Sequence, residues 1–136
     1  MSWRARTLDG TLFGPVVDTG LDRPFLLFSS QDHNRDNDAT WASFWAHQQG
    51  WKLDLKLLGA QHTSFTDAET FLPPLAPVLG LSPDQLAQDI GTIDPQRAVS
   101  IERTYLAAFF DQELRHHHSR LLDGPSPSMP EVQFEP

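Results

Sequence analysis

The sequence contains no cysteine, which excludes disulfide frameworks and thiolate metal sites. Basic residues are also few, since 10 Lys and Arg stand against 18 Asp and Glu and the formal net charge is -8. A chain with this balance has no basic surface for the phosphates of nucleic acids or anionic lipids, so we expect no nucleic-acid partner. No stretch approaches the roughly 18 apolar residues that a membrane-spanning helix needs, so we expect no membrane span.

The amino terminus also lacks the apolar segment of a secretory signal peptide. As written, the chain is therefore expected to be cytoplasmic, although a complete protein with another amino terminus could be secreted. Apolar material is present in quantity, because 39% of the residues are hydrophobic and these include four Trp and nine Phe. A chain of 136 residues is long enough for one core and too short for two.

Three segments have the patterns of strands in a mostly parallel sheet. The segment at about 3–8 alternates and ends at Asp9, the one at about 24–29 is a continuous apolar run, and the one at about 51–58 alternates Leu with Lys and Asp. An amphipathic helix with an aromatic face, at about 38–49, joins the last two into a βαβ unit. In such a unit we expect functional residues in the loops beyond the carboxyl ends of the strands.

Helices dominate the second half of the chain. They are predicted at about 66–72, 83–90 and 95–117. The first opens on a segment with the form of a capping box, from Thr66 to Glu69, and is expected to end at the Pro73-Pro74 pair. Ser82 begins a second capping box, and the third helix carries a broad apolar face that should cover the sheet.

Glycine and proline mark the irregular parts of the chain. Residues 10–23 hold three Gly and one Pro and are predicted to form a connection. Residues 119–136 hold four Pro after one Gly, which predicts an extended carboxyl-terminal tail pinned by its own apolar side chains. The expected organisation is therefore a partial α/β domain at 1–118 followed by a tail at 119–136.

The order of these elements matches the second half of an α/β-hydrolase, in which the catalytic residues follow the chain order serine, aspartate, histidine. The segments LDGTLFGPV, PFLLFSS, GAQHTSFTD, YLAAFFDQEL and LLDGPSP resemble the carboxyl-terminal half of the platelet-activating-factor-acetylhydrolase-like esterases and lipases. The resemblance spans nearly the whole chain. It implies an α/β fold with about three mostly parallel strands and packed helices.

The resemblance also implies roles for two residues. In that family the histidine lies in a His-x-x-Phe-x-Asp context, which His62, Phe65 and Asp67 match, so His62 is expected to be the general base. The family's acid follows an earlier strand in a Leu-Asp segment, which Asp9 matches. Many α/β-hydrolases instead place the acid after the strand just before the histidine strand, where Asp32 lies. We prefer Asp9 because the amino-acid sequence around it matches that of the family.

The nucleophile is missing from this sequence. No Gly-x-Ser-x-Gly pentapeptide occurs, and the nearest segment, around Ser82, lacks the second Gly and follows a proline-rich stretch. We therefore interpret Ser82 as a helix cap. The expected function is that of a carboxylic-ester hydrolase of the acyl-serine type, represented by its carboxyl-terminal fragment and inactive alone. The alternative is a non-catalytic binding or interaction module derived from the same fold.

Partners and cofactors follow from this interpretation. The complete protein is expected to take an ester or lipid substrate, and this chain to self-associate or to pair with a missing amino-terminal half. No metal or organic cofactor is needed. His116, His117 and His118 do not suggest a metal site, because adjacent residues on a helix point about 100° apart and cannot converge on one ion.

Overall fold

The computed structural model describes residues 4–136, and its centre is a four-stranded sheet in the order β1-β2-β3-β4. The strands are β1 (Ala5–Leu8), β2 (Phe25–Ser29), β3 (Lys52–Leu57) and β4 (Val132–Phe134). The first three are parallel, and β4 lies antiparallel to β3. The part of the predicted first strand at residue 3 lies outside the described residues.

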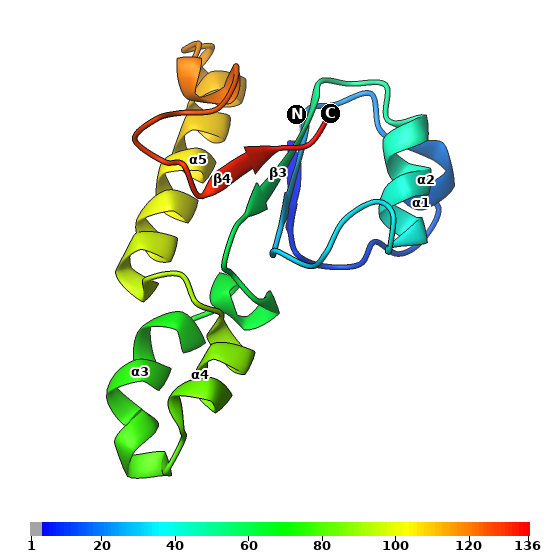
Figure 1. Cartoon of the computed structure of the whole chain (residues 1–136). Helices are drawn as coiled ribbons and strands as arrows, with labels where there is room; N and C mark the ends of the chain where they lie inside the picture. The colour runs from blue at the N-terminus through cyan, green and yellow to red at the C-terminus, as the bar shows by residue number, and fades with distance from the viewer. Residues whose placement is uncertain (1–3) are drawn as a thin grey trace.

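Helices cover both faces of this sheet (Figure 1). Those on one face are α1 (Val16–Thr19) and α2 (Ala39–His47), and the other face is covered by α5 (Pro95–Arg115). Between β3 and α5 the chain forms the 3-10 helix η1 (His62–Phe65) and the helices α3 (Ala68–Leu79) and α4 (Pro83–Ile90), which extend away from the sheet. A second 3-10 helix, η2 (Arg120–Leu122), precedes β4.

The strand β2 separates two clusters of buried apolar side chains. Its continuous apolar run is buried along its full length, as the sequence predicts for a central strand. Phe25 and Leu27 pack with Trp41 and Phe44 of α2, whereas the alternate side chains of β2 pack against α5. The α5 side contains Leu26, Phe28, Leu55, Leu57, Ile101, Tyr105 and Phe109. Burial of apolar surface stabilises a fold by about 25 cal/mol per Å². The large side chains buried on both faces of β2 therefore hold the ends of the strands in place.

Side-chain caps fix the starts of α2 and α4. Asp38 accepts hydrogen bonds from the backbone N–H groups of Thr40 and Trp41 at the start of α2. Ser82 accepts from the N–H of Gln85 at the start of α4, and the Gln85 side chain accepts from the N–H of Ser82. Ser82 therefore acts as a helix cap.

The helix predicted at 66–72 is wrong at both ends. It begins at Ala68 after Asp67, with no capping box, because the side chain of Glu69 is buried and does not return to the backbone. It also continues through Pro73, Pro74 and Pro77 to Leu79. A proline fixes φ near its helical value, so the cost is the lost backbone hydrogen bonds, and here the packing of α3 against α4 and α5 compensates for them.

The tail and the first connection also contain structure that the sequence did not predict. Residues 16–19 form the short helix α1 within the expected connection. Residues 132–134 form β4, which adds a fourth strand to the three expected. Val132 is buried within this strand, and the N–H of Leu58 donates to the carbonyl of Glu131 at 2.8 Å, so backbone pairing and one apolar anchor hold the tail on the sheet.

Among the described residues no helix is long and apolar enough to cross a bilayer.

Candidate active site

Three loops leave the sheet at one edge, because β1, β2 and β3 run parallel. Asp9 follows directly after β1, His33 lies in the loop after β2, and His62 begins η1 after β3. In Figure 1 this is the lower edge of the sheet, next to η1. The topology therefore brings residues that are far apart in the sequence to a common position.

The structure places His62 beside Asp9. The Nδ1 atom of His62 lies 3.0 Å from Oδ2 of Asp9, and because a carboxylate only accepts hydrogen bonds, the imidazole donates. Asp9 is almost fully buried, with 3% of its side chain exposed, whereas His62 is 69% exposed. The Nε2 atom of the same ring is therefore left as an acceptor at the surface, which is the arrangement that a general base requires.

Of the two candidate acids, only Asp9 contacts His62. Asp32 is exposed in the loop after β2, and its backbone carbonyl accepts a hydrogen bond from the side chain of Asn37 at 2.6 Å. Its carboxylate makes no hydrogen bond with His62 among the described residues. The two loops do meet at one edge, as expected, but only Asp9 lies against the imidazole.

The backbone of Asp9 has an unusual conformation. Its φ angle is 54°, in the left-handed region that non-glycine residues seldom adopt. The N–H of Asp9 continues the β1–β2 pairing by donating to the carbonyl of Phe28 at 2.8 Å, and Oδ1 accepts from the N–H of Ser30 at 2.6 Å. The end of β2 therefore holds both the main chain and the side chain of this aspartate. Left-handed residues of this kind occur often at functional sites, where the surrounding structure maintains them.

Sequence reasoning missed a third member of this group, His33. Its Nδ1 lies 2.9 Å from Oδ1 of Asp9, and its Nε2 lies 2.9 Å from Oδ2 of Asp38. His33 follows the central strand β2, at the same edge of the sheet as Asp9 and His62. That position was the available signal. Together the four residues form the relay His62–Asp9–His33–Asp38.

The loop that carries His62 is clamped to the turn between α4 and α5. The carbonyl of Gly59 accepts hydrogen bonds from the N–H groups of Thr92 and Ile93, at 2.7 and 3.1 Å. The hydroxyl of Ser64 accepts from the N–H of Gln61 at 2.9 Å and donates to the carbonyl of Ile90 at 2.6 Å. The position of His62 thus depends on contacts about 30 residues further along the chain.

We expect Gly91→Ala to destabilise the fold by about 2 kcal/mol or more. Gly91 has φ 81° and ψ -166°, a region open essentially to glycine alone, and a Cβ atom there would lie 2.0 Å from the carbonyl oxygen of Gly59. Urea unfolding of the variant measures the loss. Gly124→Ala is the matched control, because a Cβ atom there meets nothing within 4 Å. Equal stability of the two variants would show that the clamp is unimportant.

A group of buried polar side chains lies behind η1. Glu69 of α3 is fully buried, and neither of its carboxyl oxygens has a hydrogen-bond partner of normal geometry among the described residues; the same is true of Oε1 of Glu102 and the hydroxyl of Tyr105 on α5. Burial raises the pKa of Glu69 to about 7, against a smaller opposing effect of the Ser64 hydroxyl. Burial and then the charge of Glu69 raise the pKa of Glu102 to about 7. These carboxyls therefore favour the neutral form.

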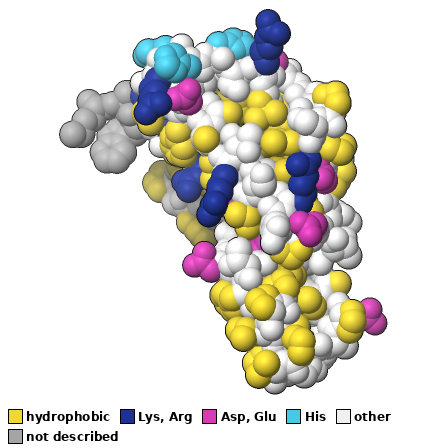
Figure 2. All heavy atoms as spheres, turned by 90° about the vertical axis from the view of Figure 1, so that its left-hand side faces the viewer, with side chains coloured by type: hydrophobic (Ala, Val, Ile, Leu, Met, Phe, Trp, Pro, Cys, Tyr) yellow, Lys and Arg dark blue, Asp and Glu magenta, His cyan; other side chains and the backbone are white. Residues whose placement is uncertain are grey.

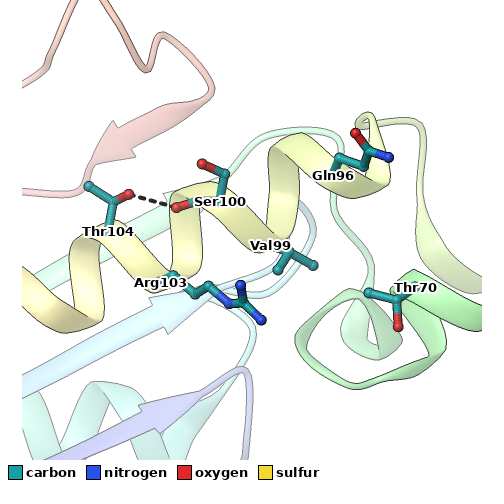
Figure 3. Close-up of a pocket in the computed structure, with 6 residues that line it drawn as sticks. All are labelled: Thr70, Gln96, Val99, Ser100, Arg103 and Thr104. Atoms are coloured by element: carbon teal, nitrogen blue, oxygen red, sulfur yellow. Dashed lines mark hydrogen bonds between the residues drawn. The ribbon is translucent and has the colours of Figure 1, made fainter.

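A hollow on the described surface lies away from His62. It measures about 540 Å³ and is lined by Thr70, Gln96, Val99, Ser100, Arg103 and Thr104. In Figure 3, Arg103 of α5 and Thr70 of α3 lie on either side of it, while the hydroxyl of Thr104 donates to the carbonyl of Ser100 at 2.7 Å within α5. None of these described side chains makes a hydrogen bond to His62 or Asp9. The hollow is therefore separate from the candidate site.

The three histidines after α5 do not form a joint site. Nδ1 of His117 contacts Asp111 at 3.3 Å, whereas Nε2 of His118 contacts Asp123 at 3.4 Å. In the part of the chain that the structure describes, no group of three or more His, Cys, Asp or Glu could hold a metal ion. These histidines contact different carboxylates at the surface.

Comparison with known proteins relates this chain to esterases. No protein-family model matches it. It is 30% identical over 138 residues to a probable 1-alkyl-2-acetylglycerophosphocholine esterase of Arthroderma benhamiae, a match that covers 93% of this chain and 35% of that protein. The chain therefore spans about a third of the length of this curated relative.

A solved structure shows the same relationship. The ferulic acid esterase from Streptomyces cinnamoneus is 34% identical and has a TM-score of 0.85, over 98% of this chain and 39% of the esterase chain. The expected resemblance to the carboxyl-terminal part of a platelet-activating-factor-acetylhydrolase-like esterase, and with it the α/β-hydrolase fold class, is confirmed.

Proposed function

Because this chain is related to esterases of the α/β-hydrolase type over nearly its whole length, we propose that it supplies the base and the acid of a carboxylic-ester hydrolase that forms an acyl-serine intermediate. The observation that carries the proposal is the 3.0 Å contact between Nδ1 of His62 and Oδ2 of Asp9, with Nε2 free at the surface. A base and a buried acid in this geometry are two members of a serine hydrolase triad.

The proposed chemistry divides between this chain and a second part of the complete protein. His62 Nε2 takes the proton of a serine hydroxyl as that hydroxyl attacks the ester carbonyl, and then returns the proton to the leaving alcohol. Asp9 holds the imidazole with hydrogen on Nδ1 and stabilises the imidazolium that forms. The serine and the oxyanion-hole donors come from the other part, because this sequence has no Gly-x-Ser-x-Gly segment. We expect the 136 residues alone to be inactive.

The substrate class follows from the relatives. One is named for an acetylated ether phospholipid and the other for an aromatic acid ester, so the acyl groups in both names are joined through a carboxylic ester. We propose a short-chain or lipid ester as the substrate here. The relay uses only imidazole and carboxylate groups and involves no metal or organic cofactor.

Two exposed surfaces support the proposal that a further part of the protein packs against this chain. Among the described strands β1 pairs only with β2, so its other edge offers unpaired backbone groups to a further strand. At the far end of the molecule α3 exposes apolar side chains, with Phe71 48%, Val78 82% and Leu79 57% exposed. Figure 2 shows hydrophobic side chains gathered over this end. We propose that the amino-terminal half of the hydrolase pairs with this chain, and that the chain self-associates without it.

A grafted esterase tests the proposed function. In it, this chain replaces the matching segment of the Streptomyces esterase, and the product is assayed on p-nitrophenyl acetate beside the chain alone. We expect hydrolysis by the grafted esterase and none above background by the chain alone, because only the graft unites the serine with His62 and Asp9. A folded but inactive graft would contradict the proposal and would favour the non-catalytic module.

A further inference from the structure

His33 lies between two carboxylates that each accept from it. Its Nδ1 is 2.9 Å from Oδ1 of Asp9 and its Nε2 is 2.9 Å from Oδ2 of Asp38, with 18% of the side chain exposed. An ionised carboxylate has no hydrogen to donate. Both ring nitrogens must therefore carry hydrogen when both acids are ionised, which makes His33 an imidazolium.

Asp38 is held as a carboxylate by its surroundings. Burial alone would raise the pKa of Asp38, but hydrogen bonds from Thr40, His33 and Trp41 outweigh burial and lower the pKa to about 2. The hydroxyl of Thr11 donates to Oδ2 at 3.1 Å as well. Asp38 therefore presents a fixed negative charge to Nε2 of His33 at neutral pH.

The contacts of Asp9 leave one oxygen for His62. Oδ1 accepts from the backbone N–H of Ser30 at 2.6 Å and from Nδ1 of His33 at 2.9 Å, whereas Oδ2 lies 3.0 Å from Nδ1 of His62. The two donors on Oδ1 favour one orientation of the carboxylate about its bond to Cβ. The direction of Oδ2 is thereby set before His62 meets it.

We infer that His33 is the positioning residue of the relay, an imidazolium that joins Asp9 to Asp38, fixes the rotation of the Asp9 carboxylate and so keeps hydrogen on Nδ1 of His62. This inference rests on the proposed function, because the tautomer of His62 matters only if Nε2 is a base. His33 itself does not touch the reacting atoms. Its positive charge also separates the negative charges of two buried aspartates, which would otherwise repel one another.

The surrounding structure is built to hold the His33 ring. The ring packs on Trp41 with centroids 4.3 Å apart, and Nε1 of Trp41 donates to the carbonyl of Gly10 at 2.9 Å. Further along the same loop Arg35 pairs with the buried Asp54 of β3 at 2.8 Å. These contacts tie the loop after β1, the loop after β2 and the start of α2 into one unit, so a rigid frame carries the imidazolium.

Nitrogen NMR of the full chain tests the inference directly. The histidines are labelled with ¹⁵N and the signals of His33 and His62 are assigned by their loss in His33→Gln and His62→Gln. At pH 7 we expect hydrogen on both nitrogens of His33, and on Nδ1 but not Nε2 of His62. In His33→Gln the share of His62 with hydrogen on Nδ1 should fall. His47→Gln, the same change on the exposed face of α2, should alter neither signal.

A second variant covers the case in which His33→Gln does not fold. Asp38→Asn replaces one carboxylate oxygen with an amide NH₂ group and keeps the other oxygen, which can still cap the start of α2. Its amide can donate to Nε2 of His33, which would then lose its hydrogen and become neutral. The inference would be overturned if either ring nitrogen of His33 lacked hydrogen in the unaltered chain at pH 7. An unchanged tautomer of His62 in a folded His33→Gln variant would overturn it as well.

Activity separates failure of this inference from failure of the proposed function. In an active grafted esterase we expect His33→Gln to lower kcat about 10- to 100-fold with little change in KM, as is typical when a group that orients a catalytic residue is removed. If the grafted esterase is active and its His33→Gln variant has the same kcat, the positioning role of His33 is refuted and the proposed function stands. An inactive graft whose NMR signals are as expected would refute the proposed function and leave the relay geometry standing.

Discussion

Replacing His62 with alanine in the grafted esterase should lower kcat about 10⁴- to 10⁶-fold, the loss seen when the base of a serine hydrolase triad is removed. The physical reason is that no other described side chain accepts a proton at this position, because Nε2 of His62 is the exposed end of the relay. The residual rate should come from the oxyanion hole and substrate binding of the Streptomyces part. Single-turnover kinetics with p-nitrophenyl acetate measures the loss.

Two aspartate variants make this experiment specific. Asp9→Asn should lower kcat about 10⁴-fold, because an amide favours the wrong tautomer of His62 and does not stabilise its positive charge. Asp32→Asn, the same change on the neighbouring loop, should leave kcat unchanged, since that carboxylate is exposed and makes no contact with His62. A large loss in Asp32→Asn with little loss in Asp9→Asn would reverse the assignment of the acid.

The second large effect concerns stability. We expect Glu69→Gln to be more stable than the unaltered chain at pH 8, by about 3 kcal/mol, and to differ from it by less than about 1 kcal/mol at pH 5. Burial raises the pKa of Glu69 from 4.5 to about 7, so the folded state binds this proton more tightly than the unfolded state. The stabilising contribution of the proton is complete below pH 4.5 and is lost as the pH rises through 7. A glutamine is neutral at every pH, so its contribution to the free energy of unfolding does not change as the pH rises.

Urea unfolding at the two pH values measures this difference. Asp54, whose pKa burial raises to about 6, changes stability in the same direction in both proteins, and Asp38, with a pKa of about 2, changes it only in more acidic solution. Glu113→Gln near the carboxyl end of α5 is the matched control and should keep the pH dependence of the unaltered chain. If Glu69→Gln keeps that dependence as well, Glu69 is already paired or exposed in solution.

The sequence was sufficient for the elements whose pattern is set by their own burial. β2 is apolar at every position because both of its faces are covered, and Asp38 and Ser82 precede their helices with the groups that cap them. The candidate site followed from topology, since a residue just beyond a parallel strand lies at the common edge of the sheet. That argument placed Asp9, Asp32 and His62 at one edge but did not choose between the two aspartates. The family resemblance favoured Asp9, and in the structure Asp9 is the one that contacts His62.

Features that depend on distant partners were not predictable. α3 continues through three prolines because α4 and α5 pack against it, which local propensity cannot show. Glu69 fitted a capping box in the sequence, yet its side chain turns into the interior instead. β4 is too short for its alternation to stand out. The position of His33 after β2 places it at the edge of the site but does not identify Asp9 and Asp38 as its partners.

The left-handed φ of 54° at Asp9 limits which acid this position can carry. Aspartate and asparagine tolerate that conformation better than other non-glycine residues, whereas a longer side chain pays roughly 1–2 kcal/mol for it. Glutamate has an equivalent carboxylate, but here it would meet a backbone penalty, and its extra methylene would displace the oxygens from Ser30 and His62 together. The handedness of one residue, rather than the charge it bears, thus selects aspartate over glutamate at the end of β1.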